Sequence, residues 1–396
     1  MSARATEMRF YSAASRATRS DEAAREMAEA LRFRLGGPAD LALLCFSPEH
    51  AAGLEAMADR ICDRLGTEQL LGMQASALIS GGFEIEGGPA ACLLAARLPG
   101  AELVGFELAH EDWRPALDDL AALRERTTVA DPRLLLILAD PESTPTSPLL
   151  AALERAWPGL PALGGLASPD TDAGPLLLLG RRAVARGAVG LAIGGPLEID
   201  LMVAQGCRPV GEPMRVTAAG RNLILALDDR PPLERLRELM QALPADERQA
   251  ATEGGLFIGR AIEPNAPRLG RGDFLVREII GFDQESGVMA VADLIGTGSQ
   301  LQFQLRDARV AAEDLALLLA PQAWQAPPAG GLLFAGSARG QRLHGRPHPE
   351  VGAIRQQMGD LALGGCFCAG EIGPIHGRNR LHGQSLALAL FRPAPA

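Results

Sequence analysis

Three segments of the chain repeat one order of elements: an apolar strand, a helix, a glycine-rich stretch and a second apolar strand. The first runs from "DLALLCF" through "SPEHAAGLEAMADRICDRLG" and "LLGMQAS" to "ACLLAARL". The second comprises "LLLILAD", "SPLLAALERAWPG", "ALGGLAS" and "AVGLAIGG", and the third "GLLFAG", "HPEVGAIRQQMG", "ALGGCFCAGEIG" and "SLALALF". Such repeated units bury their apolar faces against one another, so the repeat constrains the fold more than any single motif.

The three expected helices share a start signal. Pro48, Pro148 and Pro349 stand at the first expected helical position, where the missing N–H costs nothing. In the second and third copies the glycine stretch begins 16 residues later, at Gly164 and Gly365. The equal spacing indicates that these copies have helices of similar length.

A strand, a crossover helix and a second strand favour a parallel pair, beside which the next apolar strand can return after a glycine turn. The sequence therefore predicts an α/β to α+β fold, with repeated β-α-β-β modules in mixed sheets. Ligands usually bind just beyond the carboxyl ends of such strands. The stretches "GMQAS", "GGLAS" and "GCFCAGEIG" occupy that place in turn.

Other elements surround the modules. A strand near 8–13 and a helix over 21–35 precede the first module. Alternating stretches within 197–310 predict a central antiparallel meander, interrupted by a helix over 231–243. The proline-rich segment 320–331 is predicted to be a linker.

Composition excludes several classes of function. A net charge of -10 gives no general attraction to nucleic acid or anionic lipid, so we expect neither partner. No apolar run approaches the length of a membrane span, which predicts a soluble protein. Six scattered cysteines favour a reducing, cytoplasmic compartment. The chain contains no lysine, which removes Schiff-base chemistry and the lysine-dependent phosphate loops.

The densest group of polar residues is "CFCAGEIGPIHGRNRLHG", at 366–383. Cys368 with His382 could form a nucleophilic pair for a cysteine-dependent hydrolase or amidase. The alternation of Cys366, Phe367 and Cys368 instead favours a packed strand. Neither the cysteine nor the histidine spacing matches a structural zinc site, so we expect no metal. Because haem needs only one axial histidine or cysteine, a haem or redox-linked sensor remains an alternative interpretation.

A binding pocket is the remaining interpretation of this stretch. Glu371 follows an apolar strand, where a carboxylate is costly to desolvate unless it accepts N–H groups or meets a cation. It could therefore fix the last loop, contact a ligand, or do both. The predicted ligand-binding residues are Glu371, Arg378, Asn379, His382, Arg208, Gly370, Gly373, Cys368, Ser76 and Ser168.

The chain resembles FIST proteins, a prokaryotic sensory family, over nearly everything from Met8 to Phe391. The resemblance rests on "PALGGLASP", "VAQGCRPVGEP", "GRGDFLVREIIGFDQESGVMAVAD" and above all "GCFCAGEIGPIHGRNRLHGQSLALALF". It implies a FIST N-terminal domain, placed at 8–200, and a FIST C-terminal domain, placed at 201–391. It also implies a cytoplasmic sensor of small ligands, amino acids being proposed for the family. By position it carries over Gly370, Glu371, Gly373, Pro374, Gly377, Arg378, His382 and Gly383, with Gly206, Cys207, Arg208 and Pro209.

Together the residues and the resemblance predict a non-enzymatic cytoplasmic sensory protein without a cofactor. It would bind an amino acid or a related small polar metabolite, and it would signal through a protein partner. The alternatives are the hydrolase that uses Cys368 and His382, and a haem or redox-linked sensor.

Overall fold

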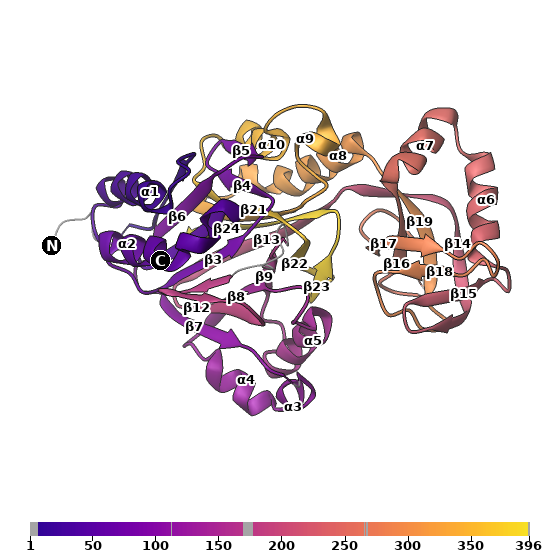
Figure 1. The fold of residues 1–396 in the computed structure, drawn as a ribbon, viewed down its shortest axis with the longest axis horizontal. Helices are drawn as coiled ribbons and strands as arrows, with labels where there is room; N and C mark the ends of the chain where they lie inside the picture. Colours follow the sequence, from indigo (N-terminus) through magenta and orange to yellow (C-terminus); the bar gives the residue numbers. More distant parts are fainter. Residues whose placement is uncertain (1–6, 112, 169–176, 265, 267, 395–396) are drawn as a thin grey trace. The chain divides into compact units, whose positions relative to one another are not determined.

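The computed structural model describes residues 7–111, 113–168, 177–264, 266 and 268–394. The chain forms two compact units (Figure 1). The α/β body contains the described residues up to Ala204, Ala316–Leu381 and those from Ser385 onward. The barrel contains the described residues of Gln205–Leu315, and His382–Gln384. The domain division after residue 200 stays a prediction, and these compact units divide the chain at other points.

Within the described residues, the α/β body holds three six-stranded mixed sheets. The first has the order β1 (Arg9–Ser15), β6 (Ala91–Arg97), β2 (Leu41–Phe46), β3 (Leu70–Gln74), β10 (Leu177–Leu179) and β11 (Arg182–Val184). The second has the order β7 (Glu102–Leu108), β12 (Ala188–Gly194), β8 (Pro132–Ala139), β9 (Ala162–Leu166), β22 (Gly370–Ile375) and β23 (Arg378–His382). The third has the order β13 (Leu197–Gln205), β24 (Ser385–Pro393), β20 (Gly330–Gly336), β21 (Leu363–Cys368), β4 (Ala77–Ser80) and β5 (Phe83–Glu86).

Corresponding strands occupy corresponding places in the three sheets. The parallel pairs are β2 with β3, β8 with β9 and β20 with β21. The returning strands β6, β12 and β24 lie antiparallel beside the first strand of each pair. The predicted fold class, repeated β-α-β-β modules in mixed sheets, is therefore confirmed.

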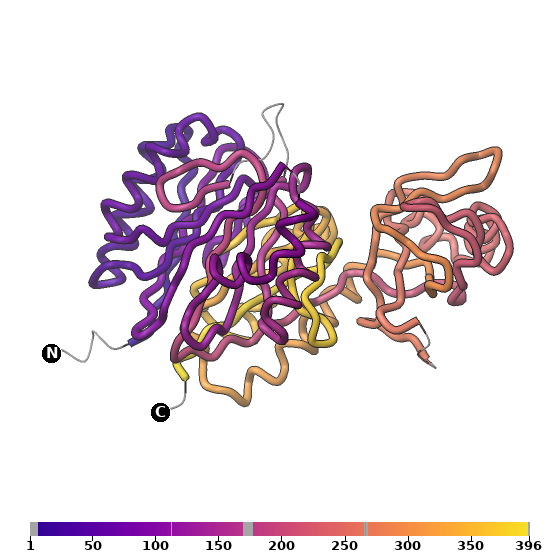
Figure 2. Tube along the Cα trace, turned by 90° about the horizontal axis from the view of Figure 1, so that it is seen from below, coloured from indigo at the N-terminus to yellow at the C-terminus, as the bar shows by residue number. Residues whose placement is uncertain are grey.

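The modules also exchange hairpins, which the sequence did not predict. The hairpin β4–β5 follows β3 in the chain but pairs with β21 of the third sheet. In the same way β22 leaves the third module and pairs with β9, and β10 leaves the second and pairs with β3. Each sheet is therefore completed by a strand from another module, as the trace in Figure 2 allows the reader to follow.

The glycine stretches were predicted as turns, but they are the second parallel strands. Gly164 lies opposite Ile137 and Gly365 opposite Leu333, with φ of 147° and 153°. A Cβ atom at either glycine would overlap the carbonyl oxygen of the residue opposite it. Glycine is needed because the strands approach too closely, in a conformation that other residues rarely adopt, and not because the chain reverses.

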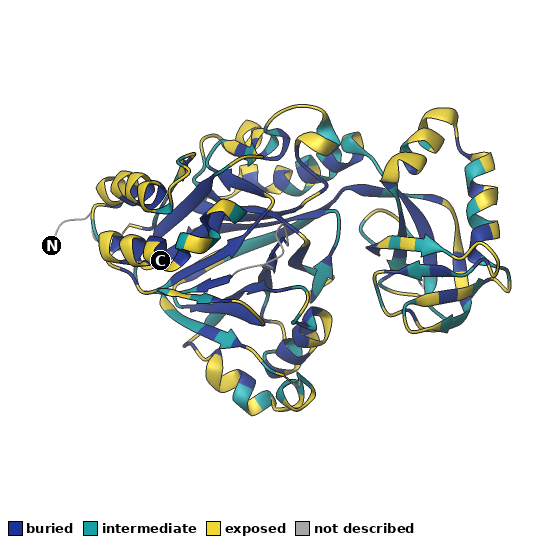
Figure 3. Ribbon diagram, viewed as in Figure 1, coloured by how far each residue is buried: buried dark blue, intermediate teal, exposed yellow. Residues whose placement is uncertain are grey.

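Helices cover the outer faces of the sheets, and the space between the sheets is apolar. Side chains of α1 (Ser20–Leu35) and α2 (Leu54–Leu65) pack on the first sheet, while α4 (Leu120–Arg126) and α5 (Thr146–Ala156) pack on the second. Leu43, Leu136 and Phe334 show that the central core draws on all three sheets. Figure 3 shows these strands as buried and the outer helix faces as exposed.

The remaining helices of the body are short or irregular. They are η2 (Pro48–Gly53), α3 (Trp113–Asp118), η4 (Ala320–Trp324), α9 (Gln341–His344) and α10 (Pro349–Met358). Pro48 and Pro349 begin helical segments as predicted, whereas α5 begins two residues before Pro148. The predicted helix over 21–35 is α1.

The meander closes into an antiparallel barrel. Its order is β14 (Cys207–Gly220), β15 (Leu223–Leu227), β18 (Met289–Val291), β17 (Phe274–Phe282), β16 (Leu256–Ala261) and β19 (Gln300–Arg306). The helical segments α6 (Pro232–Ala242), α7 (Ala245–Ala250) and η3 (Ala251–Gly255) follow β15, and α8 (Ala308–Leu319) follows β19. Val216, Ile258 and Phe303 lie in its apolar core.

Two boundaries expected from the sequence are wrong. Residues 197–204 do not belong to the meander, because they form most of β13 in the third sheet. The segment 320–331 is not a linker, because Gln322 is buried and accepts a hydrogen bond from Arg392 at 2.6 Å. None of the helices in the described part of the chain is long and apolar enough to span a bilayer.

Candidate functional site

The carboxyl ends of β3, β9 and β21 meet in what we call the strand-end junction, formed by Gln74–Ser76, Leu166–Ser168 and Phe367–Gly370. The Ser168 N–H donates to the Gln74 carbonyl at 3.2 Å, and the Ala369 N–H donates to the Leu166 carbonyl at 3.0 Å. The Ser76 hydroxyl completes the ring by donating to the Phe367 carbonyl at 3.4 Å. The three stretches that the sequence placed at strand ends are therefore joined to one another.

Two polar side chains at the junction are buried with unused hydrogen-bonding atoms. The Gln74 side chain donates through Nε2 to the Ser168 carbonyl at 3.2 Å. Its Oε1, and the Oγ of Ser168, have no hydrogen-bond partner among the described residues. Ser76, at one side of the junction, is exposed to solvent. A buried polar atom without a partner is costly, which makes these two atoms candidates for contact with a bound molecule.

Glu371 lies beside the junction and is only 1% exposed. One carboxylate oxygen accepts the Ser385 N–H at 2.9 Å and the Ser385 hydroxyl at 2.5 Å. The N–H groups at the corresponding starts of β6 and β12, those of Ala90 and Gly187, donate to serine hydroxyls instead. Glu371 therefore fixes the start of β24, which is one of the two roles that the sequence allowed.

The position of Glu371 is apolar in the other two modules. Glu371 pairs with Gly165, one residue beyond the close-approach glycine of β9. The same place opposite β21 is taken by Leu78, and opposite β3 by Leu177, both of which lie in the central core. Only the third module therefore carries the desolvation cost of a carboxylate at this position.

Cys368 is a buried thiol inside the junction. Its Sγ lies 3.5 Å from the Ala335 carbonyl oxygen and 3.3 Å from that of Gly370. Burial raises the pKa of the Cys368 thiol well above its usual range, and the nearby Glu371 carboxylate raises it further. A Cβ at Gly165 would come within 2.7 Å of this sulfur, so glycine opposite Glu371 leaves room for the thiol.

Two predicted residues use their side chains elsewhere. The buried Asn379 accepts the Ala162 N–H through Oδ1 and donates through Nδ2 to the Leu160 carbonyl, each at 2.8 Å. The Arg378 side chain is exposed, and its Nε lies 3.9 Å from a carboxylate oxygen of Glu154. The structure therefore does not bring Arg378 to the buried Glu371, and Asn379 binds backbone beside β9.

Arg208 and His382 belong to the barrel unit. Arg208 forms ion pairs with Glu247 at 2.8 Å and with Asp307 at 3.2 Å, so barrel carboxylates surround its guanidinium. His382 is buried. Of the two predicted glycines, Gly370 lies opposite Leu166, and Gly373 has no room for a side chain because a Cβ would approach Val203 to 2.6 Å.

Sequence reasoning missed a buried ionic cluster formed by Glu84, Arg339, His344, His348 and Glu350. Arg339 binds Glu350 through two nitrogens at 2.7 and 3.0 Å, and His344 Nε2 lies 3.3 Å from the same carboxylate. Glu84 accepts the N–H groups of Glu350 and of the following residue at 2.7 and 2.8 Å. Its own N–H donates to His348 Nδ1 at 3.1 Å. Glu84 comes from the exchanged hairpin, so no local pattern could have linked it to the other four.

The two carboxylates of this cluster are shifted in opposite directions. Burial raises the pKa of Glu84 to about 7, although its backbone hydrogen bonds oppose the shift. Burial alone would also raise the pKa of Glu350, but the charge of Arg339 and hydrogen bonds from His344 and Arg339 lower it to about 2. The cluster fixes β5 against the start of α10. Among the described residues, no group of three or more His, Cys, Asp or Glu side chains is arranged to hold a metal ion.

The fold defines an α/β protein in which three modules exchange hairpins around one junction, and a β-barrel is inserted in the chain order after the second module and before the third. Two family models match the chain: the FIST N domain over residues 40–230 and the FIST C domain over residues 232–374. The chain belongs to the FIST family, as its resemblance predicted. FIST domains are linked to sensory signal transduction.

The chain is similar over nearly its whole length to curated mycobacterial proteins. An uncharacterized protein of Mycobacterium tuberculosis strain H37Rv is 35% identical over 372 residues, which cover 93% of this chain and 95% of the relative. An uncharacterized protein of Mycobacterium bovis strain AF2122/97 is 35% identical over 374 residues, with the same coverage.

Proposed function

We propose that this protein is a non-enzymatic sensor that holds a small polar ligand, an amino acid or a related metabolite, at the strand-end junction. The observation that carries the proposal is the pair of buried polar atoms, Gln74 Oε1 and Ser168 Oγ, for which the described residues supply no partner. A ligand that donates to one and pairs with the other would offset their desolvation. The matching order of the three sheets supports treating the modules as copies of one unit.

The carboxylate of Glu371 gives the site a preference for ligands that bear a cationic or hydrogen-bond-donating group. A charge-assisted hydrogen bond in a buried setting is stronger than a neutral one. The position holds leucine in the other two modules, which supports a role for the carboxylate beyond filling space. A ligand at the junction would contact strands of all three modules, so binding would tighten the body as a whole and could be read by a partner protein.

The state of Cys368 supports binding without covalent chemistry. The thiolate is the nucleophilic form of cysteine, and the raised pKa keeps this thiol protonated at neutral pH. The sulfur is also enclosed by backbone carbonyl oxygens. These features favour a sensor over a cysteine-dependent hydrolase.

Ligand-induced thermal stabilisation tests the proposal. A panel of amino acids, amines and related metabolites is screened against the wild type, Ser168→Ala and Gln74→Leu. A ligand at about 100 times its Kd stabilises the folded state by about 2.7 kcal/mol, which is an easily measured rise in Tm. We expect both substitutions to reduce or abolish that rise. Ser168→Ala should not lower the Tm of the ligand-free protein, because it removes an atom without a partner among the described residues, whereas Gln74→Leu also removes the donor to the Ser168 carbonyl.

The matched control is Gln304→Leu, since Gln304 is a buried barrel glutamine that also has an unpartnered side-chain atom among the described residues. This variant should keep the ligand response. Glu371→Gln, which can still accept the Ser385 N–H, should lose preference for cationic ligands. A wild-type protein that responds to nothing in the panel, or a response that survives both junction substitutions, would refute the proposal.

A further inference from the structure

The backbone donors of the strand-end junction are used within the protein. Four N–H groups at the strand ends donate to backbone carbonyl oxygens at 2.9–3.2 Å, namely those of Ala75, Ala167, Ser168 and Ala369. The Ser76 hydroxyl and the Gln74 side-chain amide also donate to backbone carbonyl oxygens. A ligand carboxylate is normally held by such donors or by cationic side chains. These donors are therefore not available to an anion.

The unused polar atoms of the junction can accept hydrogen bonds. The orientation of the Gln74 amide is fixed, because the Ser168 carbonyl 3.2 Å away can only accept and must therefore face the nitrogen. Gln74 Oε1 is left as an acceptor without a partner among the described residues, and so is Ser168 Oγ, which can accept as well as donate. An ammonium group carries three N–H donors, which suits a site of this kind.

The charge beside the junction is also the wrong one for a ligand carboxylate. The Glu371 carboxylate is buried and raises the pKa of the Cys368 thiol, so its negative charge acts on the junction. Interactions between buried charges are screened much less by salt than those at the surface. A carboxylate placed at the junction would be repelled, whereas a cation would be attracted.

None of the described residues that form the junction is basic. The stretch 169–176, which follows its second strand end in the chain, contains no basic residue either. Arg208 is paired with barrel carboxylates, and the Arg378 side chain is exposed. Arg339, which is buried in the α/β body, binds Glu350 through two nitrogens. These arginines therefore do not offer a ligand carboxylate its usual partner.

We propose that the ligand of the strand-end junction is an amine that lacks a carboxylate group. This inference rests on the proposed function and narrows its ligand class. The ammonium group donates to Gln74 Oε1 and Ser168 Oγ, and Glu371 supplies the compensating negative charge. An amino acid brings the same ammonium group, but its carboxylate meets a negative charge and no cation. The junction therefore selects amines over the amino acids that carry the same side chain.

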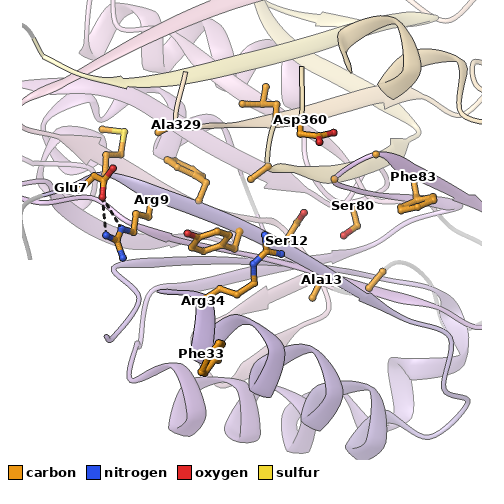
Figure 4. A pocket seen from close by; sticks show the side chains of 18 residues that line it. Glu7, Arg9, Ser12, Ala13, Phe33, Arg34, Ser80, Phe83, Ala329 and Asp360 are labelled. Atoms are coloured by element: carbon orange, nitrogen blue, oxygen red, sulfur yellow. Dashed lines mark hydrogen bonds and ion pairs between the residues drawn. The ribbon is translucent and has the colours of Figure 1, made fainter. Parts of the chain in front are cut away.

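A hollow along β1 provides a control position. Its volume is about 1230 Å³, and its lining includes Arg34 (Figure 4). The Arg34 guanidinium lies 4.5 Å from the Tyr11 ring centroid. No residue of the junction is among those that line this hollow. A ligand carboxylate could meet an arginine here, so a substitution of Arg34 separates binding in this hollow from binding at the junction.

Calorimetric titration of the full chain with matched pairs of compounds tests the proposal. Cadaverine is paired with lysine, putrescine with ornithine and agmatine with arginine, because the members of each pair differ only by the carboxylate. An amine that binds should bind about tenfold or more tightly than its amino acid, since a buried carboxylate without a partner is costly. Lysine methyl ester should bind more tightly than lysine, which separates the effect of charge from that of size.

Three variants locate the binding. Ser168→Ala should weaken the binding of amines, and it should fold normally because it removes an atom without a partner among the described residues. Glu371→Gln should reduce the preference for amines over amino acids, because it removes the negative charge. Arg34→Gln is the control and should bind amines like the wild type.

The outcomes distinguish this inference from the proposed function. Amino acids that bind as tightly as their amines, with binding that Ser168→Ala abolishes, would overturn the inference and leave the proposed function standing. Amine binding that survives Ser168→Ala and is lost in Arg34→Gln would assign the ligand to the hollow along β1 and overturn the inference. A wild-type protein that binds no member of any pair would overturn both.

Discussion

Replacing Glu84 by glutamine should stabilise the protein above neutral pH, although it removes a hydrogen-bonded carboxylate from a buried cluster. Glu84 is 4% exposed, and its Oε2 has no hydrogen-bond partner among the described residues. The other oxygen accepts two N–H groups at the start of α10. A glutamine carbonyl can accept the same two bonds, so the substitution removes the charge and leaves the cap in place.

The size of the effect follows from the raised pKa. Burial shifts the pKa of Glu84 from 4.5 to about 7, and at about 1.4 kcal/mol per unit the charged form is disfavoured by about 3 kcal/mol. An acid whose pKa is raised in the folded state contributes stability that is fully present below pH 4.5. That contribution declines as the pH rises, and it is lost above about pH 7. The desolvation cost of the Glu84 carboxylate outweighs its favourable N–H contacts. Removing the charge is therefore expected to stabilise the folded protein, although the carboxylate is hydrogen-bonded.

The assay is urea unfolding of the wild type and Glu84→Gln between pH 5.5 and pH 8.5. The variant should be more stable by about 3 kcal/mol at the upper end, and the difference should fall to about 1.4 kcal/mol at pH 5.5, which is one unit above the ordinary pKa of 4.5. Titration of buried histidines such as His50 affects both proteins and cancels in the difference. Glu86→Gln, an exposed position two residues along the same strand, should show no such trend. A stability difference that stays constant over this range would refute the reasoning.

Three further outcomes are expected. Arg339→Met should destabilise by about 3–5 kcal/mol in chemical denaturation, because it leaves the Glu350 carboxylate buried without its partner, and adding Glu350→Leu should restore part of that loss. Gly365→Ala should destabilise by about 2 kcal/mol or more, since its φ of 153° and the opposing carbonyl leave no room for a Cβ, whereas Gly352→Ala on α10 should stabilise by about 0.5–1 kcal/mol. A thiol reagent should modify Cys368 only after denaturant unfolds the protein, and rapid modification of the native protein would contradict its burial and raised pKa.

The elements of the fold were largely predictable, because each depends on a local pattern. Gly164 and Gly365 stand at the same spacing from their prolines, and the apolar runs on either side identify the parallel strands. The exchange of hairpins was not predictable. Nothing in "ALIS" near residue 78 specifies that it pairs with β21 in another module, since its apolar residues would suit any neighbouring strand.

The candidate site was predictable only in part, for the same reason. Glu371 is recognisable from sequence because a carboxylate in an apolar strand requires a partner, and its burial agrees with that reasoning. Its partner, Ser385, lies 14 residues away on another strand and carried no signal of its own. Arg378 and Asn379 were grouped with Glu371 because they are close in sequence. Along β23, however, successive side chains point to opposite faces. The Arg378 side chain is exposed, whereas the Asn379 side chain binds backbone atoms.

The departure of one module from the common pattern is the strongest reason to look for function at the junction. Leu78 and Leu177 fill corresponding positions with apolar side chains, which is the less costly solution for a packed core. A carboxylate is not required to accept a hydrogen bond from the Ser385 N–H, because serine hydroxyls accept from the corresponding N–H groups in the other two modules. The Glu371 carboxylate lies beside a junction in which two buried polar atoms lack partners among the described residues, and we therefore propose it as a contact for a ligand. Glu371→Leu separates the two explanations: a purely structural role predicts loss of stability alone, whereas a binding role predicts loss of the ligand response even in protein that remains folded.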